Sequence, residues 1–261
     1  PVINTSITEI TPAGPCYRGR PAVDLAKMGC SFEAVAELLW TGTLHHEPVR
    51  WEHEALPEDF ARLMDGVTKV DRKLPMPRAF ALATSMLGVA ETARSEMRRG
   101  STISAARQLI LALTGCVGYL GRAPRFRMPQ KAASVAECVA ESFDLGSDEK
   151  AVNAINHALV LCADHEMSSS TFAARVAAST GAELRACVLA GIAAHSGATL
   201  GGGCDRTEYL LRDAKTREDV RQRLAETERA GARIPGFNLP VYPKGDPRAR
   251  HLLALAHSFA Q

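Results

Sequence analysis

The residues best suited to chemistry begin with a histidine between two carboxylates. Asp164, His165 and Glu166 follow one apolar helical run, and a series of serines opens the next. A histidine beside acids and the open N–H groups of a helix N-terminus is a natural site for a carboxylate ligand. The same string also fits a plain turn between two helices in which Ser168 or Ser169 caps the second one. Taken alone, the string leaves both interpretations open.

A run of glycines follows the next helical segment. Leu200 precedes Gly201, Gly202 and Gly203 within the stretch Ser196–Asp205. Glycine has no Cβ, so backbone amides in such a run can approach a ligand closely. A flexible connection between two helices would have the same composition.

A third segment joins a glycine- and proline-bearing stretch, Ala232–Asp246, to an arginine, Arg248. A planar guanidinium suits a carboxylate because it can donate two parallel hydrogen bonds. The alternative for Arg248 is a surface salt bridge at the start of a helix. The stretch before it is the best candidate in the chain for a hinge and a functional loop.

The remaining histidines show no spacing that compels a metal site. His157 and His195 lie in apolar helical runs, where we expect them to be core or interface groups. The chain also lacks the glycine patterns that bind nucleotide phosphates or dinucleotides.

Helices must position all of these residues, because apolar side chains recur at helical spacing through most of the chain. The first clear helix is expected between a Ser31 N-cap and a stop at Gly42. The further helical runs are expected at about Pro57–Val70, Pro77–Arg99, Thr102–Tyr119, Ala133–Leu145, Asp148–Asp164, Ser169–Ser179, Glu183–Ser196, Arg206–Asp213, Arg217–Gly231 and Pro247–Ala260. Only Ile3–Thr11 alternates like a strand, which predicts at most a small terminal hairpin. The sequence therefore predicts an all-α protein.

Composition narrows the class of protein. The chain has 261 residues, of which 46% are hydrophobic and 23% charged, enough for one large core or two domains. Its net charge of +2 supplies no strong field to gather nucleic acid or an anionic membrane. The seven cysteines are scattered without metal-type spacing, which favours reduced, mostly buried thiols. No stretch reaches the roughly twenty apolar residues that span a bilayer, and no leader is evident, so we expect a soluble cytoplasmic protein.

Two stretches are unusually rich in alanine, around Ala154–Leu159 and Ala186–Ala194. Small side chains let helix backbones approach closely, so such helices can be buried on most faces. The pattern fits a buried antiparallel helix pair at a subunit interface and equally well the core of a monomer.

Taken together and in this order, the motifs resemble those of the citrate synthase family. Cys16–Ala26 resembles the family's YRG…DLA motif, and Ser31–Gly42 its sFEEvAyLLlyG motif. The Asp164-His165-Glu166 turn matches a DHE-type turn, and Asp246-Pro247-Arg248-Ala249 matches DPRA. The resemblance runs from about Ile3 to Ala249. It implies an all-α fold with a large and a small helical domain, which we divide at residues 1–165 and 166–261.

The resemblance also marks what differs. The glycine run aligns with GPLHGGAN, in which a histidine that hydrogen-bonds the thioester oxygen falls at Leu200. The later loop aligns with GFGH, in which Asn238 replaces the second glycine and Leu239 replaces the histidine that polarises the ketone of the oxo acid. Leucine can do neither, so no residue is assigned a catalytic role. The family's catalytic aspartate falls beyond Gln261, and the C-terminal part is expected to be short.

By resemblance, His165 and Arg248 are the substrate-binding residues. The loop residues that would contact CoA are Pro235, Gly236, Phe237 and Asn238, with acyl-CoA as a possible cosubstrate and no covalent cofactor or metal. The family is one of acyltransferases and its members are dimers, so a homodimer, or a heterodimer with a related subunit, is expected.

Three functional hypotheses follow. The first is a citrate-synthase-like protein, a possible pseudoenzyme, that binds an oxo acid or a CoA thioester but is defective in ordinary condensation of acetyl-CoA with oxaloacetate. The second is an active member of the family that uses another acyl-CoA or 2-oxo acid, or cleaves a citryl-CoA-like thioester. In that case Cys204 and Asp205 are nearby polar candidates, with Asp164 and Glu166 as possible bases. The third is a non-catalytic regulatory or assembly subunit.

Overall fold

The structure is a computed structural model of a mostly helical chain. It describes residues 4–45, 47, 49–51, 56–57, 59–68, 75–90, 99–130, 132–146, 148–197, 202–212, 214–237 and 239–259. The helices are α1 (Ala22–Lys27), α2 (Phe32–Thr41), α3 (Phe60–Thr68), α4 (Met76–Ala90), α5 (Arg99–Cys116), the 3-10 helix η1 (Val117–Leu120), α6 (Val135–Ser142), α7 (Glu149–Leu161), α8 (Ser169–Ser179), α9 (Leu184–His195), α10 (Gly202–Leu211), α11 (Arg217–Arg229) and α12 (Pro247–Phe259). The all-α prediction is therefore confirmed.

The N-terminal sheet is larger than the predicted hairpin. It has three strands in the order β1 (Thr8–Thr11), β2 (Gly14–Tyr17) and β3 (Arg20–Pro21), all antiparallel. Arg18 and Gly19 join β2 to β3 with positive φ angles of 48° and 80°, as a type I′ hairpin turn requires. The Arg18 guanidinium donates to the Leu39 carbonyl at 2.8 and 3.2 Å, which holds this unusual turn against α2. The alternation rule missed β2 because that strand is buried along most of its length.

Helix ends agree with the local capping signals. The Ser31 hydroxyl accepts the Ala34 N–H at the start of α2, and Gly42 ends that helix with a φ of 83°. Ser168 caps α8 by accepting the Thr171 N–H. Each cap satisfies a backbone group that the helix cannot pair internally.

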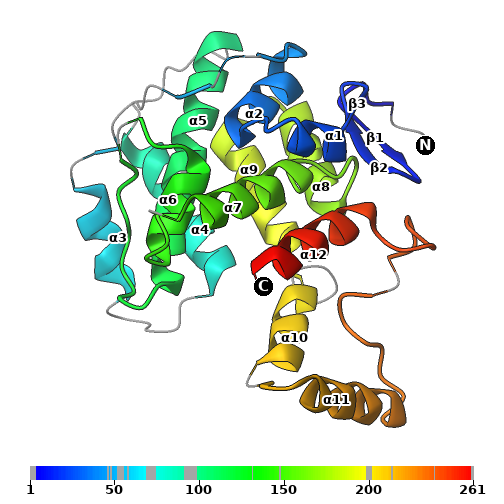
Figure 1. The fold of residues 1–261 in the computed structure, drawn as a ribbon. Helices are drawn as coiled ribbons and strands as arrows, with labels where there is room; N and C mark the ends of the chain where they lie inside the picture. The colour runs from blue at the N-terminus through cyan, green and yellow to red at the C-terminus, as the bar shows by residue number, and fades with distance from the viewer. Residues whose placement is uncertain are drawn as a thin grey trace.

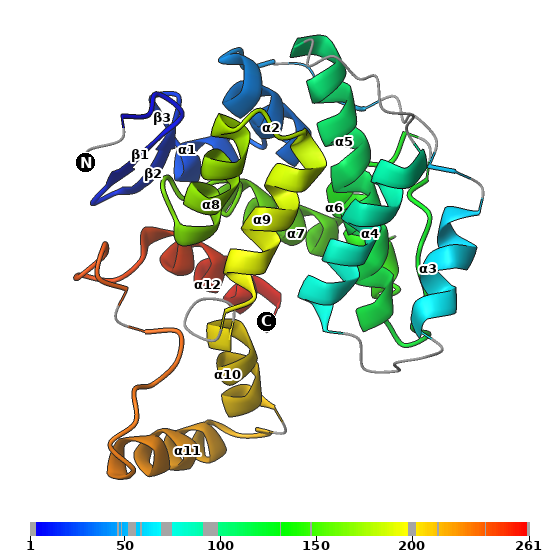
Figure 2. The same ribbon diagram turned by 180° about the vertical axis from the view of Figure 1, so that it is seen from behind.

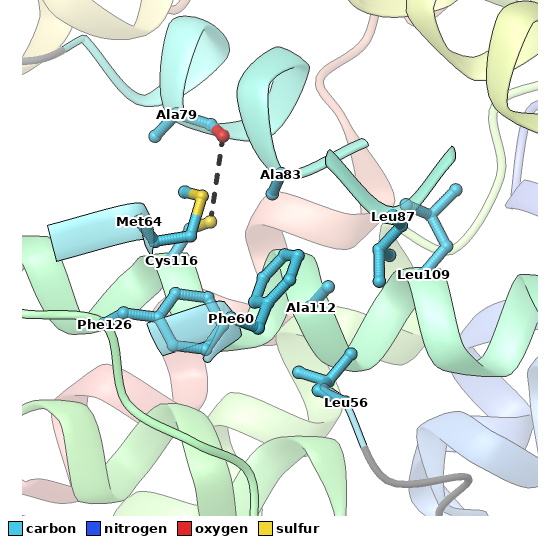
Figure 3. Packing of buried hydrophobic residues seen from close by; sticks show 10 residues of the cluster. All are labelled: Leu56, Phe60, Met64, Ala79, Ala83, Leu87, Leu109, Ala112, Cys116 and Phe126. Carbon is cyan, nitrogen blue, oxygen red and sulfur yellow. Dashed lines mark hydrogen bonds between the residues drawn. The ribbon is translucent and has the colours of Figure 1, made fainter. Parts of the chain in front are cut away.

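The body of the protein contains α1 to α9, and α12 lies across it (Figure 1). One core cluster joins α3, α4 and α5 and includes Phe60, Leu87 and Leu109, with the edge of Phe60 against the Phe126 ring (Figure 3). A second cluster joins β2, α1, α2 and α7 through Tyr17, Leu25 and their neighbours. Figure 2 shows α10 and α11 projecting from this body, with the chain returning to α12. The division at residues 165 and 166 stays a prediction.

Helix α5 and the turn after it form a long apolar stretch of the body. Among the described residues, Thr102–Leu120 is long and apolar enough to cross a bilayer, contrary to the expectation from the sequence. Leu109, Ala112 and Cys116 on this stretch belong to the core cluster with α3 and α4. A core helix of this length meets the same criterion, so the stretch gives little indication of a membrane protein.

The cysteines are only partly as expected. The six described ones carry free thiols, and Cys116, Cys138 and Cys187 are buried. Cys162, in contrast, is exposed at the end of α7. His195 is also exposed in the single chain, whereas His157 is buried as predicted.

Candidate functional site

The His165 turn is tied to the N-terminal sheet. It connects the end of α7 to the Ser168 cap of α8, and the Glu166 N–H donates to the Asp164 carboxylate at 3.0 Å. The fully buried Tyr17 hydroxyl lies 3.1 Å from the carbonyl oxygen of Leu161 and 3.2 Å from that of Asp164. β2 therefore fixes the position of the turn that presents His165.

Arg248 lies in the first turn of α12 and is paired with Asp246. Its Nε donates to Asp246 Oδ1 at 3.1 Å, and its Nη2 donates to Oδ2 at 2.7 Å. The side chains are 15% and 21% exposed, so this is a half-buried pair and not a surface salt bridge. Burial opposes ionisation of Asp246, but hydrogen bonds from the Arg248 side chain and backbone outweigh it and lower the pKa of that carboxyl. Within the described part of the chain, Nη1 of Arg248 has no hydrogen-bond partner and can donate to a ligand.

Tyr242 brings the two substrate-binding candidates together. The Arg248 Cζ lies 5.7 Å from the centroid of the Tyr242 ring, a cation–π distance. The His165 ring meets the same ring edge to face, with centroids 6.1 Å apart and planes at 78°. Tyr242 is only 4% exposed. The structure thus places His165 and Arg248 in one cluster around a buried aromatic ring.

Two polar atoms in this cluster are buried without a protein partner among the described residues: the Tyr242 hydroxyl and His165 Nε2. Burial of the His165 ring lowers its pKa, the positive charge of Arg248 lowers it further, and Asp246 and Asp164 oppose the change. His165 is therefore neutral at neutral pH and can donate from one ring nitrogen. A neutral imidazole beside a guanidinium can hold a small molecule that carries a carboxylate and a carbonyl.

The loop that resembles a CoA-binding segment lies against α10. Gly236 has a φ of 82°, and a Cβ there would lie 3.1 Å from the Thr207 Oγ1. The Phe237 side chain is 69% exposed, and Asn238 lies outside the described residues. Pro235 lines a neighbouring cavity of about 610 Å³. That cavity is formed with α10 and α11 and is also lined by Asp205, Arg206, Tyr209, Leu210, Arg212, Arg223, Glu226, Thr227, Ala232 and Arg233.

The structure describes one of the two leucine positions, Leu239, and not the other, Leu200. Leu239 is 40% exposed, and its carbonyl accepts the Tyr242 N–H at 2.9 Å. It lies on the same loop as Tyr242 and offers no side-chain donor. Leu200 lies outside the described residues. In the part of the chain that the structure describes, no three His, Cys, Asp or Glu side chains come together as metal ligands.

Sequence reasoning missed two members of this site. Tyr242 stands in the aromatic-containing stretch before Arg248, and a tyrosine six residues before a candidate carboxylate clamp was a visible signal. Asp246 had a local signal too, since an acid two residues before an arginine at a helix start can reach it. Tyr209 of the cavity, 76% exposed, had none, because nothing in its helix separates it from an ordinary surface residue.

The helical fold and this cluster define the class of protein, and comparisons with known proteins agree. A sequence model of the citrate synthase C-terminal domain matches residues 1–261, so the chain belongs to the citrate synthase family. It is 28% identical over 261 residues to citrate synthase 2 of Bacillus subtilis, covering 95% of this chain and 69% of that protein. It is 29% identical over 273 residues to a citrate synthase of Haloferax volcanii, covering 94% and 68%.

Solved structures agree in fold. A citrate synthase of Thermoplasma acidophilum, in a ternary complex with carboxymethyl coenzyme A and oxaloacetate, superposes with a TM-score of 0.80. The sequences are 22% identical, and the match covers 96% of this chain and 68% of that one. For the citrate synthase of Pyrobaculum aerophilum, the TM-score is 0.73 at 23% identity, covering 99% and 69%. The expected family and its helical fold are thereby confirmed.

Proposed function

We propose that this protein binds a 2-oxo acid and a CoA thioester at the His165–Arg248 cluster and the adjoining loop, and that it is a poor catalyst of ordinary condensation of acetyl-CoA with oxaloacetate. One observation carries the proposal: Leu239 offers no donor on the very loop whose Tyr242 packs against His165 and Arg248. His165 and Arg248 lie together in one cluster. The position at which the family resemblance implies a hydrogen-bond donor is occupied by the hydrocarbon side chain of Leu239.

The binding half is supported by chemistry and by a relative. Arg248 keeps Nη1 as a donor, and His165 is neutral, so a carboxylate and a ketone oxygen can each be met. The cavity beside Pro235 carries arginine side chains, which suit phosphate groups, and an exposed tyrosine ring, which suits a base. The Thermoplasma acidophilum enzyme, with which the chain shares its fold, was solved with oxaloacetate and a CoA derivative.

The catalytic half follows from the cost of a missing donor. Carbon–carbon bond formation puts negative charge on the thioester oxygen and then on the ketone oxygen. Removing one donor aimed at such an oxygen typically costs about 10²–10³ in rate. With leucine at both positions 200 and 239, neither charge has the side-chain donor that the family resemblance implies.

Two measurements test the proposal. Thiol release with acetyl-CoA and oxaloacetate should run well below the usual enzymatic range of roughly 1–10³ per second. Calorimetric titration with oxaloacetate should show binding that Arg248→Met weakens at least about tenfold, the loss expected for a charge-assisted contact. Arg221→Met, in an exposed pair with Glu218, is the matched control and should bind as the wild type does. Ordinary turnover, or binding indifferent to Arg248, would contradict the proposal.

The second candidate function is condensation with a different acyl-CoA. It is suggested by a relative, a 2-methylcitrate synthase of Shewanella oneidensis, at 26% identity over 252 residues. The same thiol assay with propionyl-CoA distinguishes the two. Turnover with propionyl-CoA alone would establish an active enzyme of altered specificity.

We also propose that two copies of this chain associate through α8 and α9. Helix α8 buries none of its residues within the single chain, and Phe172 and Val176 are 45% and 49% exposed. Pairing would remove these neighbouring apolar side chains from water, and exposed apolar side chains that lie together often mark an interface. Light scattering should give a dimer for the wild type and a monomer for Phe172→Glu, whereas a wild-type monomer would overturn this.

A further inference from the structure

Two histidines that are far apart in the sequence meet between α7 and α12. Nδ1 of His157 lies 2.8 Å from Nε2 of His251, and the two ring planes differ by only 9°. His157 is 8% exposed and His251 is half-buried. Helix α12 lies across the body at this point (Figure 1), so the contact joins the last described helix to the core.

The hydrogen bond between the rings tolerates only some protonation states. Of the two facing nitrogens, one must carry the proton and the other must offer a lone pair. A neutral pair meets this condition, and so does a pair with one extra proton on an outward-facing nitrogen. When both rings are imidazolium, both facing nitrogens carry N–H groups, no acceptor remains, and two positive charges repel each other.

The neighbouring charges do not relieve that repulsion. Burial lowers the pKa of His157, and among the described residues His251 lowers it further. The charged side chains on the described elements packed against α7 are exposed or bonded to other groups, apart from Glu33 Oε2, which is buried without a partner among the described residues. They are Asp24 and Lys27 of α1, Glu33 and Glu37 of α2, Glu137 and Glu141 of α6, Glu149 and Lys150 of α7 itself, and Arg248, Arg250 and His257 of α12.

The contact also bears on the substrate cluster. Arg248 precedes His251 by three residues, so both project from neighbouring positions on one side of α12. Leu252, next to His251, packs against the core cluster that contains Tyr17. Whatever holds this turn of α12 against α7 therefore also fixes the distance of Arg248 from Tyr242 and His165.

We propose that His157 and His251 form a proton-sensitive clasp that holds α12 against α7, positions Arg248, and opens when both rings are protonated. The statement about Arg248 rests on the proposed function; the clasp itself does not. Within this proposal His157 and His251 are positioning residues and touch no ligand.

The sign of the pH effect follows from linkage. A histidine whose pKa is lower in the folded than in the unfolded chain binds fewer protons when folded. The clasp therefore contributes fully above the ordinary histidine pKa of about 6.5 and is lost as the pH falls below it.

Urea unfolding between about pH 5 and pH 8 tests the clasp on the whole chain. His251→Gln keeps an amide N–H that can donate to His157 Nδ1, but it cannot gain a proton. His257→Gln is the matched control, since His257 is exposed on the same helix. We expect the urea midpoint to fall with pH in the wild type and in His257→Gln, and by less than roughly half as much in His251→Gln. An equal fall in all three proteins would overturn the clasp.

Oxaloacetate titration at the two ends of the same pH range tests the positioning of Arg248. Wild-type affinity should fall several-fold more than that of His251→Gln as the pH is lowered. His165 is present in both proteins, so its protonation contributes to both falls in affinity, and the difference between the two proteins reports on the clasp. Equal falls would overturn the positioning role. Absence of binding at every pH would count against the proposed function, while the urea midpoints would still decide on the clasp.

Discussion

The ring of Tyr242 lies under the guanidinium of Arg248, with Arg248 Cζ 5.7 Å from the ring centroid. The same ring also meets the His165 ring in an edge-to-face contact. Its hydroxyl is buried without a partner among the described residues. The ring, and not the hydroxyl, therefore organises the cluster in the absence of a ligand.

Substitutions at Tyr242 separate the ring from its hydroxyl. Tyr242→Phe keeps the packing and removes an unpaired buried polar group, so the free energy of unfolding should stay the same or rise. Tyr242→Ala removes the ring and should cost about 3–5 kcal/mol. Urea unfolding measures both, and a Phe variant as unstable as the Ala variant would mean that the hydroxyl has a partner essential to the fold.

Glu37 is a buried carboxylate whose loss should destabilise the fold. It is 4% exposed and accepts the Trp51 Nε1–H at 3.0 Å and two Arg107 contacts at 2.8 and 2.6 Å. Glu37→Ala leaves the buried Trp51 Nε1–H unmatched and removes the partner of Arg107, whose side chain is 38% exposed, so it should lower the free energy of unfolding by about 1–3 kcal/mol.

The control for Glu37 is an exposed ion pair of the same type. Glu218 and Arg221 pair at 3.3 Å with side chains 78% and 72% exposed, so Glu218→Ala should cost little. Chemical denaturation of both variants in one buffer decides the matter. Equal losses would show that the Glu37 network contributes no more than a surface pair.

Gly236 should resist substitution more than another glycine of similar φ. Gly231→Ala introduces only backbone strain, because its φ is 66° and nothing lies within 4 Å of the new Cβ. That strain costs roughly 1–2 kcal/mol. Gly236→Ala adds a contact of 3.1 Å with Thr207 Oγ1, so its loss of stability should be larger. If the two unfolding curves coincide, packing of the Gly236 loop against α10 does not contribute to stability.

Histidines at the two leucine positions should raise the rate of condensation. The double variant Leu200→His and Leu239→His regains two donors, each of which is typically worth about 10²–10³ in rate. We expect thiol release from acetyl-CoA and oxaloacetate to become at least about tenfold faster than in the wild type. Leu63→His, at an exposed position of α3, controls for the added imidazole. An unchanged rate in the double variant would mean that these positions do not face the reacting atoms.

Much of the architecture follows from local signals in the sequence. Helix periodicity, the Ser31 and Ser168 caps and the Gly42 stop all correspond to observed helix boundaries. These signals are local, since a helix forms from hydrogen bonds within four residues and a cap satisfies an N–H three residues away. The β2–β3 hairpin was not predicted from the sequence. Its turn places a non-glycine residue, Arg18, at positive φ, and a hydrogen bond to the distant helix α2 holds it there.

The site divides along the same line. The sequence by itself determined the family, and it marked His165 and Arg248 as candidate binding residues and the leucines as positions where donors are expected. Only the tertiary structure decided that Tyr242 joins His165 to Arg248, that Asp246 already engages the guanidinium, and that His157 meets His251 across 94 residues. The physical reason is that residue types and short spacings carry local energies, whereas contacts between distant segments depend on how whole helices pack.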